Sequence, residues 1–188
     1  MNMLNWYTNC LLTKPYKTKM ITSFCTFGVG DIIGQTIENN SKKKKGEKTI
    51  FNFIRFLKQA TFGTLMTPYL HLHFGKIVPF IVPIASNPNP KLRVAKSMLY
   101  DQTVHATFFT FVYFMWLNLV NHTGFEKAVN NTKELLIPTM IANWKVWPAA
   151  MLINFSIIPQ HYSVLYVNTV AIFWNAYISF VFNRSKKQ

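Results

Sequence analysis

The chain has 188 residues, of which 50% are hydrophobic, 17 are phenylalanines and only 6 are acidic. Charged residues make up 14% of the chain, below the roughly one quarter that is typical of soluble domains, and the net charge is +14. The lysines lie in short clusters between apolar stretches and do not line one helix face. This placement favours membrane lipids with anionic headgroups as partners and excludes nucleic acid.

The apolar pattern predicts an all-α integral membrane bundle of about four to five helices, formed by residues 1–188 as a single domain. An N-terminal segment containing Trp6 and Leu12 among lysines is expected to lie at the membrane interface. The lysine-rich stretch 39–52 predicts a solvated loop between the first two helices, with headgroup contact or targeting as alternative roles. The candidate spans are residues 19–38, 53–74, 91–121, 135–158 and 163–182.

The first span has two distinct faces, a seam of small residues and a stripe of polar residues. Gly30 and Gly34 form a GxxxG pair, which predicts close approach of a neighbouring helix. Asp31, Gln35 and Glu38 follow at helical spacing and form one polar stripe. In the second span, Arg55 and Lys58 are expected to extend from the helix start to the membrane interface.

The sequence contains no pattern that predicts an enzyme, a cofactor or a metal site. His71 and His73 are two residues apart, so on a helix they point to different sides. Cys10 and Cys25 have no metal-ligand or CxxC spacing and are expected to be core thiols, with redox sensing as the alternative. No catalytic residues are predicted.

Polar groups recur within the later apolar spans. Asp101 and His105 are four residues apart, which predicts a hydrogen bond along the helix; an acid/base pair is the alternative. A charged side chain at a helix centre costs about 2.5–3.5 kcal/mol on insertion scales, so we expect Lys145 to pair with Asp31 or Asp101 near a constriction. Interhelical hydrogen bonds of about 0.6 kcal/mol each offer a purely structural explanation. The candidates for a pore or polar core are Asp31, Gln35, Asp101, His105, Lys145, Asn154, Asn168 and Asn175.

Motifs along nearly the whole chain match one family. The most specific is a C-terminal pattern of W-x-x-W-P, N-F, P, N, W and S, formed by Trp144, Trp147, Pro148, Asn154, Phe155, Pro159, Asn168, Trp174 and Ser179. On these residues the chain resembles the Mpv-seventeen/peroxisomal-membrane-protein-twenty-two family. Further signature positions with a structural role implied by the resemblance are Gly30, Pro68 and Gln102. Departures include His73-Phe74 in place of Trp-Tyr, and Met151 in place of a glutamine.

The resemblance implies a protein of the mitochondrial inner membrane, with the peroxisomal membrane as the alternative. It further implies a channel or pore for small solutes or ions that contributes to mitochondrial homeostasis; a structural membrane protein without conductance is the competing interpretation. The permeant solute is not identified by the residues, and a homo-oligomer is an open alternative to a monomer.

Overall fold

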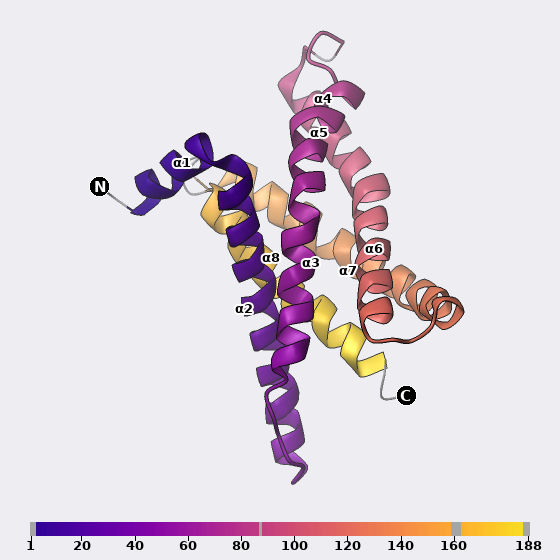
Figure 1. Cartoon of the computed structure of the whole chain (residues 1–188). Coiled ribbons are helices and arrows are strands. Elements are labelled where there is room, and N and C mark those ends of the chain that lie inside the picture. The colour runs from indigo at the N-terminus through magenta and orange to yellow at the C-terminus, as the bar shows by residue number, and fades with distance from the viewer. Residues whose placement is uncertain (1–2, 87, 159–162, 186–188) are drawn as a thin grey trace.

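The computed structural model describes residues 3–86, 88–158 and 163–185, and within these ranges the chain forms helices and no strand (Figure 1). This confirms the predicted all-α class. In chain order the elements are α1 (Met3–Thr13), α2 (Pro15–Lys44), α3 (Phe53–Leu72), η1 (His73–Ile77), α4 (Val78–Ile81), α5 (Pro90–Tyr100), η2 (Asp101–His105), α6 (Ala106–Val120), α7 (Phe125–Ser156) and α8 (Ser163–Ser185).

Two of the long helices contain a single wide turn of π-helix. In η1 the N–H of Val78 donates to the carbonyl of His73, and in η2 the N–H of Ala106 donates to the carbonyl of Asp101. Each bond closes a turn with one residue more than an α-turn, so α3–η1–α4 and α5–η2–α6 run on as continuous helices. Such π-bulges are rare and occur frequently at functional sites.

The helix boundaries differ from the sequence expectation at two places. α2 continues to Lys44, so the connector is shorter than the predicted loop 39–52, and the lysines of its last turn complement the negative end of the helix dipole. The second span was expected over residues 53–74, but the helix continues to Ile81. Pro79 follows the wide turn of η1, which ends at Ile77.

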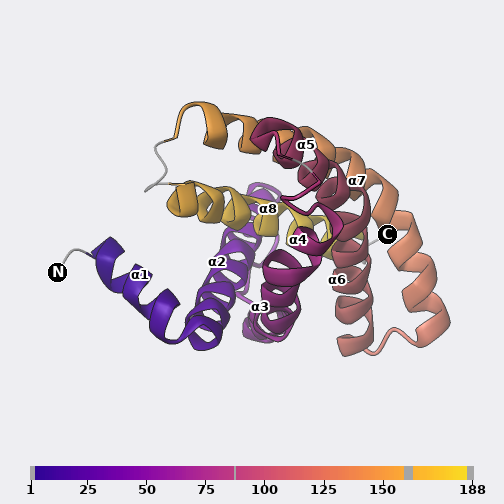
Figure 2. The same ribbon diagram turned by 90° about the horizontal axis from the view of Figure 1, so that it is seen from above.

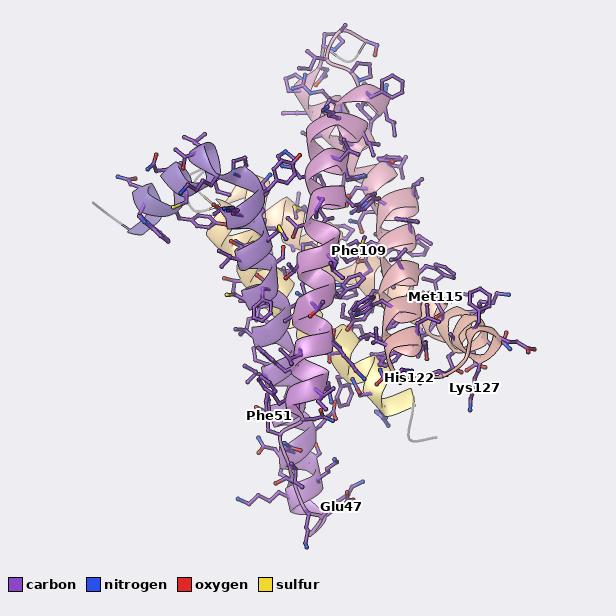
Figure 3. All side chains as sticks on the ribbon, in the orientation of Figure 1. Glu47, Phe51, Phe109, Met115, His122 and Lys127 are labelled. Carbon is purple, nitrogen blue, oxygen red and sulfur yellow. The ribbon has the colours of Figure 1, made fainter. Side chains whose placement is uncertain are left out.

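α2 packs along both α3 and α8, while α6 packs along α7 (Figures 1 and 2). The shared core is aromatic: Phe62 contacts the rings of Phe27, Phe109 and Tyr113, and Phe109 lies between α3 and α6 (Figure 3). Residues of α2, α3, α6 and α8 contribute to this core, namely Phe27, Phe62, Tyr113, Phe114, Leu117, Ile178 and Phe182.

The predicted GxxxG contact is present between α2 and α8. A Cβ atom added to Gly30 would lie 2.6 Å from the Cβ of Asn175, and one added to Gly34 would lie 3.2 Å from the carbonyl oxygen of Ala176. Both distances are too short for a side chain to fit without movement. The two helices therefore meet backbone to backbone, as a small-residue seam allows.

The surface and the interior are distributed as in a membrane protein. Large apolar side chains such as Leu12, Phe80 and Ile137 are exposed, whereas polar side chains such as Asp31, Gln59 and Asn118 are buried. By length and composition, one of the described helices, Pro90–Val120, is able to cross a membrane. The expectation of core thiols was wrong for Cys25, which is exposed, while Cys10 is half-buried.

Candidate functional site

A buried ion pair joins α2 to α3. The guanidinium of Arg55 donates from Nε to Oδ1 of Asp31 at 2.7 Å, and its terminal nitrogens lie 3.0 and 2.9 Å from the two carboxylate oxygens of Glu38. The Asp31 side chain is 0% exposed and that of Arg55 is 13% exposed. One cation therefore faces two carboxylates, and the planar fork of arginine matches that geometry.

The ion pair extends into a hydrogen-bonded network that reaches α6 and α8. The hydroxyl of Ser179 donates to Oδ1 of Asp31 at 2.6 Å and accepts from Nη2 of Arg55 at 3.0 Å. Gln59 donates to the same hydroxyl at 3.0 Å, and its Oε1 accepts from the hydroxyl of Tyr113 at 2.7 Å. We call Asp31, Arg55, Gln59, Tyr113 and Ser179 the paired network.

Gln35 ties the α2–α3 connector to this network. Its Nε2 donates to Oδ2 of Asp31 at 2.8 Å and to the carbonyl of Asn52 at 3.0 Å, while its Oε1 accepts from the N–H of Asn52 at 2.7 Å. The Asn52 side chain in turn accepts from the N–H of Arg55 and caps α3. The polar stripe of α2 thus fixes the start of the helix that carries Arg55.

A polar pocket of about 210 Å³ lies beside the paired network. Arg55 and Gln59 belong to both, and Lys58 adds a second cation whose Nζ donates to Oδ1 of Asn121 at 2.8 Å. No carboxylate lines this pocket among the described residues. Its lining residues are Asn52, Ile54, Arg55, Lys58, Gln59, Leu117, Asn121, Phe182 and Asn183.

The expected pairing of Lys145 is wrong. Asp31 pairs with Arg55, and Asp101 faces His73, whereas Lys145 is exposed on α7. Arg55 was expected to reach the membrane interface, but it turns inward because two carboxylates on α2 face it. Sequence spacing along one helix cannot reveal which cation a neighbouring helix presents.

A second polar cluster forms where η1 and η2 meet. Nε2 of His73 lies 3.8 Å from Oδ1 of Asp101, and the rings of His73 and His105 stack with centroids 3.7 Å apart. The predicted hydrogen bond between Asp101 and His105 is not formed: Nδ1 of His105 lies 3.0 Å from the hydroxyl of Tyr69, and Oδ2 of Asp101 accepts from Gln102 at 3.2 Å. We call His73, Asp101 and His105 the histidine cluster.

Four of the remaining candidates, Gln102, Trp144, Trp147 and Trp174, make contacts between neighbouring helices. Gln102 accepts from Asn143 at 2.8 Å through its side chain, and its carbonyl accepts from the indole N–H of Trp144 at 3.0 Å. Trp147 and Trp174 meet edge to face at 6.5 Å. Asn154 and Asn175 are buried and Asn168 is half-buried, while Pro68 and Pro148 lie inside α3 and α7. Pro159 and the side chain of Phe155 lie outside the described residues.

Sequence reasoning missed the importance of Gln59 and Tyr113, and it dismissed His73. Gln59 follows Arg55 by four residues on an otherwise apolar helix, a spacing that places both side chains on one face. That signal was available. Tyr113 gave none, because a tyrosine in a phenylalanine-rich span resembles ordinary core. His73 acquires its partners from a helix some thirty residues away, across a long connection.

The sequence is similar to a known protein family and to several of its members. A family model described as the Mpv17 / PMP22 family matches residues 118–179. Protein SYM1 of Saccharomyces cerevisiae is 32% identical over 185 residues, which cover 96% of this chain and 90% of that protein. PXMP2/4 family protein 2 of Dictyostelium discoideum is 30% identical, with 93% and 88% covered. Protein sym1 of Schizosaccharomyces pombe is 30% identical, with 91% and 87% covered. No solved structure matches the chain.

Proposed function

The chain belongs to the Mpv17/PMP22 family of organelle membrane proteins, and we propose that it is a channel for small solutes or ions. The observation that carries the proposal is the polar pocket, whose wall includes Arg55 and Gln59 of the paired network. In this proposal the pocket is the mouth of the channel, and the paired network beside it is the constriction.

In this proposal the described conformation is closed. The paired network fills the space between α2, α3 and α8, and Asp31 and Arg55 neutralise each other there. Opening requires α8 to move, so that Ser179 leaves Asp31 and water replaces its hydroxyl. Arg55 and Lys58 would then face the path, and a lining of cations favours anions and neutral polar solutes.

The mitochondrial inner membrane is the location we propose, with the peroxisomal membrane as the alternative. Both protein SYM1 and a PXMP2/4 family protein are among the relatives. Imaging of a tagged chain against mitochondrial and peroxisomal markers decides between them. The lysines of the last turn of α2, Lys42 to Lys44, are positioned at a helix end where they would contact anionic headgroups.

Single-channel recording of the purified protein in planar bilayers tests the channel proposal. We expect conductance, with a reversal potential in a potassium chloride gradient that shows preference for chloride. Lys58→Gln should lower the ratio of chloride to potassium permeability because it removes a cation from the pocket. Lys145→Gln is the matched control, since Lys145 is exposed on α7 and does not line the pocket.

A structural role without conductance is the second candidate, and one observation favours it. Both carboxylate oxygens of Asp31, both ends of the Gln59 amide and the Ser179 hydroxyl have hydrogen-bond partners. Such full pairing is what a rigid polar core requires. The folded wild-type protein would then show no conductance at any applied voltage, a result that rejects the channel.

A further inference from the structure

We propose that the histidine cluster is a binding site for a divalent first-row transition metal ion, with His73, Asp101 and His105 as its ligands. One potential ligand atom from each of the three side chains lies within 4.8 Å of the other two. Two imidazoles and one carboxylate form a donor set that suits zinc and its neighbours, whereas calcium and magnesium prefer oxygen ligands alone.

The histidine cluster holds buried polar atoms that make no hydrogen bond. Nδ1 and Nε2 of His73 and Oδ1 of Asp101 are buried and make no hydrogen bond. The His73 side chain is 1% exposed, so water does not solvate it from outside. Buried polar atoms are nearly always paired in folded proteins, and an orphaned group calls for a specific explanation. A bound cation would take up one ring nitrogen of His73 together with Oδ1 of Asp101.

The distance between His73 Nε2 and Asp101 Oδ1 is close to that between two ligands of one metal ion. His73 Nε2 and Asp101 Oδ1 face each other at 3.8 Å, which is too long for a hydrogen bond. Two ligands of a tetrahedral zinc ion lie about 3.3 Å apart, as follows from metal–ligand bonds of about 2.0–2.1 Å. The separation of His73 Nε2 and Asp101 Oδ1 is therefore close to that of two zinc ligands, whereas the stacked rings of His73 and His105 must turn to direct one nitrogen each at the ion.

The hydroxyl of Tyr69 orients the ring of His105. Its Nδ1 lies 3.0 Å from the hydroxyl of Tyr69, which leaves Nε2 to bind the ion. Metal-binding histidines commonly engage their second ring nitrogen in such an outer contact, which orients the ring. Rings from Tyr100 and Phe74 contact His73, so the ligand side chains sit in an aromatic shell.

All three ligands lie in the π-helical turns. His73 begins η1, and Asp101 and His105 begin and end η2, so every ligand belongs to one of the two π-helical turns. Single π-helical turns within α-helices are rare and occur frequently at functional sites. The Asp101 side chain is 28% exposed, which gives an ion a route of entry.

The test uses the full-length protein in detergent, stripped with a chelator and dialysed against zinc. We expect one zinc ion per chain by elemental analysis, an increase in Tm on zinc addition, and visible absorption of tetrahedral type when cobalt replaces zinc. His73→Phe keeps the ring and its packing but removes both nitrogens. It should weaken zinc affinity by more than the roughly 10–100-fold that loss of an outer contact causes.

The matched control is His122→Asn. His122 lies at the turn between α6 and α7, far from η1 and η2 (Figure 3), and asparagine tolerates its positive φ of 56°. This variant should bind zinc as the wild type does. Tyr69→Phe should weaken binding by about 10–100-fold, because His105 loses its orienting contact.

Two results would overturn the proposal. One is a wild-type protein that binds less than one zinc ion per chain. The other is a His73→Phe protein whose zinc affinity equals that of His122→Asn. If His73→Phe does not fold, Asp101→Asn takes its place, since Oδ1 of Asp101 makes no hydrogen bond that the substitution removes. None of these results depends on conductance, so the metal-site proposal and the channel proposal are tested independently.

Discussion

The paired network and the histidine cluster are both buried, polar and built from residues on different helices, yet their polar atoms are satisfied to different degrees. In the paired network Asp31 receives hydrogen bonds from Arg55, Gln35 and Ser179. In the histidine cluster His73 makes no hydrogen bond through either ring nitrogen. Asp31 and His73, whose side chains are 0% and 1% exposed, are thus equally buried but differ in pairing.

This difference separates two uses of a polar group inside a membrane bundle. A paired charge stabilises the packing of the helices that supply its partners, and removal of one partner leaves the other uncompensated. Unpaired groups contribute little to that packing, and their desolvation is offset only when a ligand arrives. The same substitution should therefore have different effects in the two places.

The largest effect is expected for Arg55→Met, which leaves the carboxylates of Asp31 and Glu38 without their cation. We expect a loss of about 3–5 kcal/mol in the free energy of unfolding, measured by denaturant titration in mixed micelles. Lys145→Met is the control, and as an exposed change on α7 it should stay within about 0.5 kcal/mol of the wild type. Equal effects of the two variants would contradict the assignment of Arg55 to the network.

The comparison is sharpest when one substitution is made in both places. Asp31→Asn removes the charge that Arg55 and Ser179 bind, and hydrogen bonds to charged groups contribute about 1.5–3 kcal/mol each. Asp101→Asn in metal-free protein should change the free energy of unfolding by less than about 1 kcal/mol, because Oδ1 has no partner to lose. The same micelle titration measures both. If Asp101→Asn is the more destabilising of the two, the proposed difference in pairing between the paired network and the histidine cluster is contradicted.

A smaller effect is expected at the seam between α2 and α8. Gly30→Ala places a methyl group 2.6 Å from the Cβ of Asn175, so the helices must separate, at a cost of about 1–3 kcal/mol. Gly75→Ala is the control, since nothing lies within 4 Å of its added Cβ. Disulfide cross-linking of cysteines introduced on α2 and α8 reports the separation. Unchanged cross-linking in Gly30→Ala would show that the seam tolerates the methyl group.

The smallest effect concerns the far end of the paired network. Tyr113→Phe removes the hydroxyl that donates to Gln59 and leaves Oε1 unpaired, which should lower Tm and cost about 1 kcal/mol. Tyr177→Phe on the exposed face of α8 is the control. A Tm equal for both variants would remove Tyr113 from the network.

Local sequence patterns determined much of the fold. Long apolar runs with few acids predicted helices in a membrane, and GxxxG predicted the close approach of a neighbouring helix to α2, because both signals depend only on helical periodicity and side-chain size. The polar face of Asp31 and Gln35 was likewise visible from spacing alone. Which partners would fill that face was not, since Arg55 and Ser179 lie 24 and 148 residues from Asp31.

Tertiary structure decided the rest. Pairing of charges depends on which helix becomes a neighbour, and sequence distance says little about that in a bundle with long connections. Hence Lys145 was assigned a role that Arg55 fills. The π-turns at η1 and η2, which carry His73, Asp101 and His105, are also invisible to a pattern that assumes 3.6 residues per turn. The sequence by itself determined the helices and their faces; the packing determined what each face meets.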